Sequence, residues 1–325
     1  MTAPLRKHAL ALVTLLALAA APFLGFGDGF ALGLLARAMI LGMAAVSLSL
    51  LVGGAGLVSL GHAATMGIGA YTVVAFDAAG ISEGLIVFPA AIAAAAAYAL
   101  LTGAVSLRTS GVHFIMITLA FGQMAFFTTS SFSSLGGDDG YTLYARTEWL
   151  GTRILDNRLT FHFLCLGLLA LVWVGGALLL GSRFGRVLRA ARENPQRALA
   201  VGFQPYPFRL VAYVMAGAVG GLAGALLANA TEFVSPALLS WTRSGELLFM
   251  VILGGVGQIG GAILGALAIV LLEESLSHLM VYWRLVFGPL LVLSVLFLPD
   301  GLVGAPLRLR AAFRFASPKR RNADA

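Results

Sequence analysis

Apolar runs, each about 20 residues long and joined by short polar connections, fill most of this 325-residue sequence. Only 11% of the residues are charged and the mean hydropathy is +0.94, whereas a soluble domain is about one quarter charged. Runs of this length and composition are long enough to cross the apolar core of a bilayer as helices. The sequence therefore predicts an all-α polytopic membrane protein, with residues 1–325 forming a single transmembrane domain of about 8–10 membrane segments.

One of these runs is broken by glycines. The candidate spans are residues 9–26, 30–52, 57–78, 85–107, 112–132, 159–180, 210–230, 247–272 and 285–298. If residues 247–272 crossed only once, the basic C-terminal tail would lie outside, so we expect a hairpin of two short membrane helices there. The hairpin would bend at a glycine-rich break in this run. The predicted hinge or packing residues there are Gly254, Gly255, Gly257, Gly260 and Gly261. It should face the protein interior, and a large side chain at Gly255 or Gly257 is expected to block a close backbone crossing.

The positive charge is concentrated in segments that set the orientation. Arg6 and Lys7 precede the first run, residues 181–209 form a basic insert, and a basic tail covers residues 305–325. The positive-inside rule places all three in the cytoplasm. We therefore expect a multi-pass protein of a bacterial inner membrane, with both termini on the cytoplasmic side. This explains the net charge of +7 without nucleic-acid binding. The first run also resembles a signal peptide, and the alternative is a retained first span.

The basic insert, residues 181–209, is predicted to fold into helices rather than to form a simple connecting loop. Its arginines recur every third residue from Arg183 to Arg192, and apolar residues fill the other face, which predicts an amphipathic helix. Asn194 is a plausible N-cap for a second short helix that begins near Pro195 and ends before Gly202. We interpret the insert as a docking surface, with a topology signal as the alternative. The residues proposed to form it are Arg186, Arg189, Arg192, Glu193, Asn194, Pro195, Arg197 and Gly202.

Sequence patterns of enzymes are missing. The chain has no G-x-x-x-x-G-K-[ST] phosphate loop, so an ATPase that drove transport would be another chain. It has no H-E-x-x-H, no G-x-S-x-G and no His/Cys cluster with metal-ligand spacing. We therefore predict no catalytic residue, no metal site and no cofactor bound by this chain. No carboxylate lies deep in a predicted span, which argues against a proton- or sodium-coupled carrier.

Two polar, glycine-punctuated segments inside predicted spans are candidates for a transport pathway. Residues 59–72 carry His62, Thr65 and Tyr71, and residues 111–123 carry Thr118 and Gln123. These side chains could line a cavity, or they could belong to close helix packing with hydroxyls bonded to the backbone. Arg37, also within a predicted span, is expected to neutralise a nearby group or to extend to the interface; contact with a solute is the alternative.

Four segments together resemble the LivM-type permease subunits of branched-chain amino acid ABC importers. They are residues 59–71, 107–123, 185–202 and 254–266, and the resemblance extends over about residues 30–298. The chain departs from the family pattern at Met66, where an aromatic residue is common, at His113, which replaces a tyrosine, and at Ala262, which replaces a proline. The combination is specific for the permease family and less specific for the solute.

The resemblance implies an ATP-driven, alternating-access pathway shared with a second, LivH-like permease subunit. Two cytoplasmic ATPase subunits, which would bind the ATP, and a periplasmic solute-binding protein would complete the importer, and the insert would be its coupling helix. A branched-chain or related amino acid is the expected solute. Urea, short amides and aromatic carboxylates are alternatives within the same architecture. A facilitative channel without an ATPase is the alternative from another class, and it would need no coupling helix.

Overall fold

Helices form nearly all of the structure. The computed structural model describes residues 3–25, 27–280, 282–297 and 301–304. The helices are α1 (Ala3–Ala20), α2 (Gly29–Ser49), the π-helix η2 (Leu50–Ala55), α3 (His62–Ala78), α4 (Gly84–Ser106), α5 (Val112–Ser131), α6 (Arg158–Gly181), α7 (Arg183–Glu193), α8 (Pro195–Ala200), α9 (Pro205–Thr231), α10 (Trp241–Gly254), α11 (Ile259–Leu279) and α12 (Trp283–Phe297). Short 3₁₀ turns are η1 (Ala21–Phe23), η3 (Ser133–Leu135), η4 (Ile154–Asp156) and η5 (Pro236–Leu239), and β1 (Tyr141–Thr142) pairs antiparallel with β2 (Phe233–Val234). This architecture confirms the predicted fold class.

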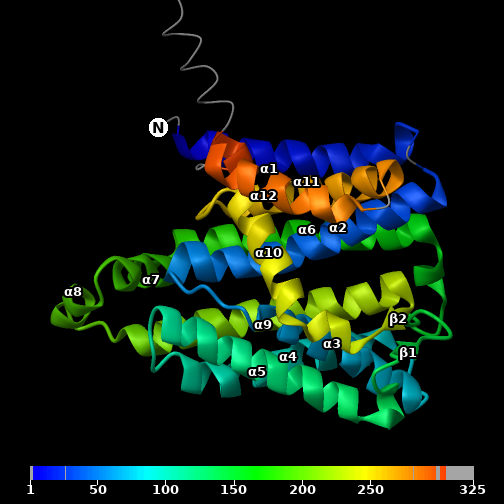
Figure 1. Ribbon diagram of the computed structural model, residues 1–325, viewed down its shortest axis with the longest axis horizontal. Coiled ribbons are helices and arrows are strands. Elements are labelled where there is room, and N and C mark those ends of the chain that lie inside the picture. Colours follow the sequence, from blue (N-terminus) through cyan, green and yellow to red (C-terminus); the bar gives the residue numbers. More distant parts are fainter. Residues whose placement is uncertain (1–2, 26, 281, 298–300, 305–325) are drawn as a thin grey trace, which may run out of the picture.

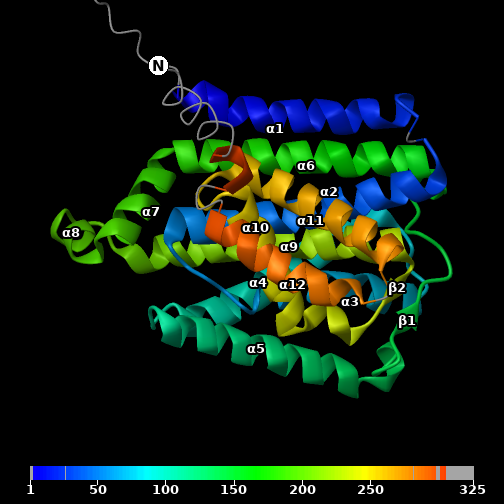
Figure 2. The same ribbon diagram turned by 45° about the horizontal axis from the view of Figure 1, so that its top comes forward.

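The long helices pack as two groups. One contains α3, α4 and α9, and the other contains α2, α6 and α11. In Figure 1 α10 runs obliquely between the two groups, where it contacts α2, α3 and α11. Figure 2 shows α1 along the outer edge beside α6, and Leu18 of α1 is buried. The His162 ring nitrogen Nε2 of α6 also lies 3.1 Å from the Leu18 carbonyl oxygen.

Small residues allow α3 and α9 to approach each other closely. A Cβ atom added at Gly224 of α9 would lie 1.7 Å from the Met66 carbonyl oxygen, and one at Gly69 of α3 would lie 2.1 Å from the Gly221 carbonyl oxygen. In lipid, where apolar burial drives little helix association, such close approach supplies the dispersion contacts that hold spans together. The glycine content of the sequence is therefore used at this interface.

The structure corrects several predicted spans. Six helices among the described residues are long and apolar enough to cross a membrane, and α3 and α10 are not among them. The predicted spans 9–26 and 285–298 contain shorter apolar helices, Ala9–Phe23 and Leu285–Ser294. The span predicted over residues 57–78 begins only at His62, because Gly56 (φ +70°) ends η2 and the chain runs without helix from there to Gly61. Hydropathy does not detect such a break, since residues 57–61 remain largely apolar.

The predicted hairpin exists, but its arms differ. α10 has 14 residues, whereas α11 has 21 and is long enough to span a membrane alone, so the expectation of two short helices was wrong. The non-helical turn covers only residues 255–258, and Gly260 and Gly261 lie inside α11. Glu273 and Glu274 lie in the last turns of α11.

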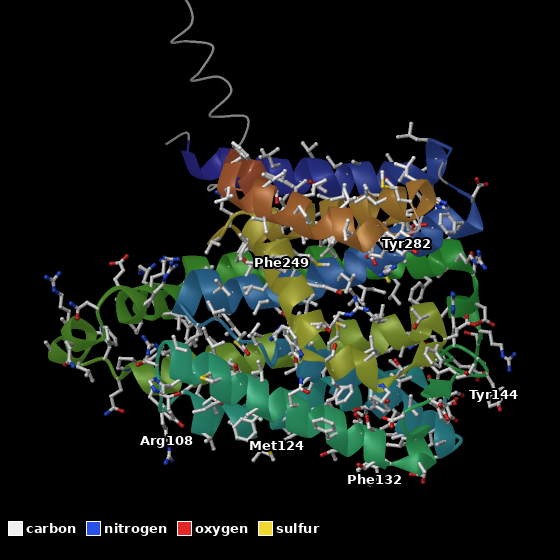
Figure 3. The ribbon with its side chains drawn as sticks, viewed as in Figure 1. Arg108, Met124, Phe132, Tyr144, Phe249 and Tyr282 are labelled. Atoms are coloured by element: carbon white, nitrogen blue, oxygen red, sulfur yellow. The ribbon has the colours of Figure 1, made fainter. Side chains whose placement is uncertain are left out.

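The bundle has two distinct ends. The start of α1, Arg108, α7, α8 and residues 301–304 lie at one end, which Figures 1 and 3 show on the left. The segment between α5 and α6, with β1 and the exposed Tyr144, lies at the other end. This arrangement agrees with the predicted parity of the spans. The predicted basic tail, residues 305–325, lies outside the described residues.

Candidate functional site

The insert folds as the local sequence predicts. Ser182 caps α7 by accepting a hydrogen bond from the Gly185 N–H, and Asn194 caps α8 by accepting one from the Arg197 N–H over 3.0 Å. Pro195 takes the first helical position of α8, where its missing N–H costs nothing. Gly202 follows α8 with φ +91°, a left-handed conformation that favours glycine. The insert is therefore a pair of capped helices at one end of the bundle.

Arginines attach the insert to the ends of the spans. The Arg189 Nη1 atom donates to the Leu180 carbonyl oxygen of α6 over 2.8 Å, and the Arg209 Nη2 atom of α9 donates to the Ala191 carbonyl oxygen of α7 over 2.7 Å. Arg186 donates to the Gly181 carbonyl oxygen over 3.3 Å. These bonds satisfy carbonyls at the C-terminal ends of helices, where cations are favoured. Motion of α7 would therefore pull on α6 and α9.

Exposed apolar side chains mark the outer surface of the insert, which sequence reasoning missed. Leu199, Val201 and Phe203 are 49%, 74% and 44% exposed, in a region outside the candidate spans. Contiguous apolar exposure beyond the membrane marks protein contact surfaces. The signal in the sequence was the apolar content of residues 198–203, which do not follow the basic helical pattern of α7.

The two glycine-rich breaks meet at the end of the bundle beside α7. Val256 and Gly257 are exposed there, so, contrary to the sequence-based prediction, the turn is not enclosed by the rest of the chain. A Cβ atom added at Gly53 in η2 would lie 2.6 Å from the Gly257 Cα atom in the turn between α10 and α11. On the other side, Arg192 of α7 donates a hydrogen bond from Nη1 to the Gly53 carbonyl oxygen, and Leu188 packs toward Gly54. A π-helix leaves its local carbonyls poorly placed for α-helical bonding, so a guanidinium can reach one. The insert thus touches the first break, and the first break touches the second.

Several predicted pathway residues gather where α3 begins. The His62 Nε2 atom lies 2.7 Å from the Ser47 Oγ atom of α2, and the Thr65 hydroxyl donates to the His62 carbonyl oxygen over 2.7 Å. Both side chains are buried, with exposures of 2% and 1%. A Cβ atom at Gly61 would lie 2.2 Å from the Thr118 carbonyl oxygen of α5. His62, Thr65 and Thr118 therefore surround the end of the first break.

Tyr71 and Gln123 lie apart from that group. The Tyr71 hydroxyl is buried and has no hydrogen-bond partner among the described residues, which is unusual for a buried polar group. Gln123 of α5 is half-buried, and its neighbour Met124 projects outward from the bundle edge in Figure 3. Contact between any of these five side chains and a solute stays a prediction.

Arg37 has the neutralising role that the sequence favours. Its Nη2 atom lies 3.2 Å from the Glu273 Oε2 atom of α11, and both side chains are about one-third exposed. An ion pair between α2 and α11 lowers the cost of placing either charge within the bundle.

Comparison with known proteins adds independent findings. The family described as "Branched-chain amino acid transport system / permease component" matches residues 30–295. The high-affinity branched-chain amino acid transport system permease protein LivM of Escherichia coli is 30% identical over 324 residues, covering 91% of this chain and 75% of that protein. LivM of Salmonella typhimurium is 29% identical, covering 82% of this chain and 67% of that protein. The Escherichia coli permease protein LivH is 30% identical over 128 residues, which are 38% of this chain and 41% of LivH. No solved structure matches the chain.

Proposed function

This chain belongs to the family of permease components of branched-chain amino acid transport systems, and we propose that, as one membrane subunit of an ABC importer, it moves a branched-chain or related amino acid. The family membership confirms the resemblance carried by the four sequence segments. The chain is a multi-pass membrane protein. We place it in a bacterial inner membrane with α7 and α8 in the cytoplasm.

The remaining subunits follow from the same proposal. A second, LivH-like permease would pair with this chain, and similarity to LivH over part of this sequence supports a pair of related folds. Two cytoplasmic ATPase subunits would bind and hydrolyse ATP, while this chain binds no cofactor. A periplasmic binding protein would deliver the solute. ATP binding would shift the importer between inward-open and outward-open states through differential contacts with the insert.

The observation that carries the mechanism is the chain of contacts from α7 to both breaks. Arg192 contacts Gly53, and Gly53 contacts the turn at Gly257, so a displacement of the insert reaches the two places where the spans are not regular helix. Breaks of this kind allow a helix to bend at modest cost. A facilitative channel would have no use for this connection, which favours an ATP-coupled importer.

The docking claim is tested by charge reversal and by polar substitution. We expect Arg189→Glu with Arg192→Glu, and separately Leu199→Ser with Val201→Ser, to reduce co-purification of the ATPase subunits and solute-stimulated ATP hydrolysis. The chain should still insert, because none of these residues lies in a candidate span. Tyr144→Ser, at a 95% exposed position on the opposite end, is the control. Wild-type co-purification and hydrolysis in both double variants would favour the channel.

Orientation and solute need separate measurements. A cysteine at Asp139, which is exposed between α5 and β1, should react with a membrane-impermeant reagent from outside, and a reporter after Arg321 should be cytoplasmic. An exported reporter would overturn the orientation. Thermal-shift screening of the partner binding protein should select branched-chain amino acids, and selection of urea, amides or aromatic carboxylates would reassign the solute.

A further inference from the structure

A cavity of about 450 Å³ opens at the end of the bundle that carries β1 and β2. The first turns of α2, the start of α6, the end of α9 and the last turns of α11 form its walls. Small-molecule sites occupy about 300–1,000 Å³. Arg37 lies eight residues beyond Gly29, so the cavity reaches about 12 Å along α2 at 1.5 Å per residue. None of the predicted pathway residues lines it.

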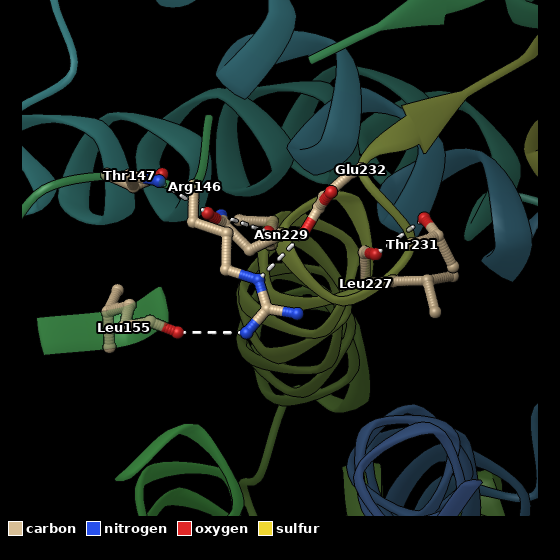
Figure 4. Close-up of polar contacts among 8 residues, drawn as sticks. Arg146, Thr147, Leu155, Leu227, Asn229, Thr231 and Glu232 are labelled. Carbon is tan, nitrogen blue, oxygen red and sulfur yellow. Dashed lines mark hydrogen bonds and ion pairs between the residues drawn. The ribbon is translucent and has the colours of Figure 1, made fainter. Parts of the chain in front are cut away.

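Two of the arginines that line the cavity, Arg37 and Arg146, already form ion pairs within the chain. Arg37 pairs with Glu273, and Figure 4 shows Arg146 between the Glu232 carboxylate, 3.1 Å from its Nε atom, and the Leu155 carbonyl oxygen. The Arg146 guanidinium also lies 5.0 Å from the centre of the Phe161 ring. These contacts hold two guanidiniums in fixed positions on the cavity wall.

Arg158 and Glu274 are the groups left available. Within the part of the chain that the structure describes, the Arg158 side chain has no ion pair or hydrogen bond. Among the described residues, the Glu274 carboxylate forms an ion pair only with His278, at 3.1 Å, and that histidine side chain is 71% exposed. Of its described lining residues, the cavity therefore offers one unpaired cation, Arg158, and one carboxylate with a weak, solvated partner.

The N-terminus of α2 strengthens the cationic side. Arg158 directs its guanidinium over Gly29, where an added Cβ atom would lie 1.9 Å from Nη1. The N-cap residue Asp28 makes no side-chain bond to the first N–H groups of α2. A guanidinium beside an uncapped helix N-terminus is a favourable place for a carboxylate. Phe30, Leu32 and Phe161 supply an apolar wall in the same cavity.

We propose that this cavity binds a free aliphatic amino acid as a zwitterion, on the outer side of the membrane and away from the two breaks. Arg158 and the start of α2 receive the carboxylate, Glu274 receives the ammonium group, and the aliphatic side chain lies against the apolar wall. The choice of an amino acid as the ligand rests on the proposed function. That Arg158 and Glu274 are available in the cavity is independent of the proposed function. An anionic lipid headgroup would use Arg158 but would gain nothing from Glu274.

The test measures binding of three probes to the full chain in nanodiscs of phosphatidylcholine. The probes are L-leucine, leucinamide, which lacks the carboxylate, and 4-methylpentanoate, which lacks the ammonium group. We expect Arg158→Gln to weaken L-leucine and 4-methylpentanoate about tenfold or more and to leave leucinamide unchanged. Glu274→Gln should weaken L-leucine and leucinamide and leave 4-methylpentanoate unchanged. This crossed pattern cannot arise from misfolding, which would affect all three probes.

Two further variants separate position from charge. Gly29→Ala should weaken L-leucine because its Cβ atom displaces the Arg158 guanidinium, which is flexible enough to move without unfolding the helix. Arg153→Gln is the control, since Arg153 is on the same outer segment but pairs with Glu148 and does not line the cavity. L-Leucine binding that none of the cavity variants alters would overturn the proposal, as would loss of Arg158-dependent binding when phosphatidylglycerol is added. Leucine transport by the assembled importer is measured separately, so that failure here leaves the proposed function standing.

Discussion

Gly53 of the first break lies against Gly257 of the second break, and each position excludes a side chain for a different reason. At Gly53 an added Cβ atom would lie 2.6 Å from the backbone of Gly257, while the backbone of Gly53 itself is not left-handed. At Gly257 an added Cβ atom meets nothing within 4 Å, but φ is +85°. The first glycine is therefore required by close approach and the second by backbone conformation, and substitutions can separate the two.

The largest effect is expected at Gly53. Gly53→Leu should abolish transport and lower the free energy of unfolding by about 1–3 kcal/mol, because the contacting atoms belong to backbone and cannot move aside. Transport in proteoliposomes and the thermal unfolding midpoint measure both consequences. Gly167→Leu on α6, where an added Cβ atom meets nothing within 4 Å, is the matched control. Normal transport by Gly53→Leu would show that the breaks do not need to touch.

A smaller effect is expected at Gly257. Leucine there must adopt a left-handed conformation, which costs about 1–2 kcal/mol, whereas asparagine tolerates that region better. Gly257→Leu should therefore reduce transport, and Gly257→Asn should retain most of it. This corrects the physical reason given by sequence analysis, which expected a side chain at Gly257 to enter a crossing. Equal losses for leucine and asparagine would restore the steric explanation.

The contrast between the two glycines also shows which features of the structure could be predicted from the sequence. The caps at Asn194, Pro195 and Gly202 were predictable because capping depends on residues adjacent in the chain. The break near Gly254 was predictable from local glycine content. The contact between Arg192 and Gly53 joins residues 139 positions apart, and the π-helix that exposes the Gly53 carbonyl oxygen follows from packing. The late start of α3 and the cavity beside Arg158 were missed for the same reason, since both depend on which helices become neighbours.

Arg192 tests whether the first break is held from outside the membrane. Arg192→Ala removes the hydrogen bond to the Gly53 carbonyl oxygen, and we expect a severalfold loss of transport per ATP hydrolysed with little change in the thermal unfolding midpoint. Arg183→Ala, which removes an exposed arginine from the first turn of the same helix, should leave coupling intact. The interpretation fails if both variants couple equally well.

The smallest effect is expected at Asn194, and it can be compared with a second asparagine cap. Asn194 caps the six-residue α8, whereas Asn157 caps the 24-residue α6 by accepting a hydrogen bond from the Leu159 N–H. Replacing either by alanine should cost about 0.5–2 kcal/mol of helix stability. A six-residue helix has few internal hydrogen bonds to compensate, and its end shapes the surface around Leu199 and Val201, whereas α6 is held along its length by packing. Asn194→Ala should therefore speed amide hydrogen exchange in residues 196–200 and weaken ATPase co-purification slightly, and Asn157→Ala should affect only the first turn of α6. Unchanged exchange in α8 would mean that contacts with α7 and α9, rather than the cap, hold the docking surface in shape.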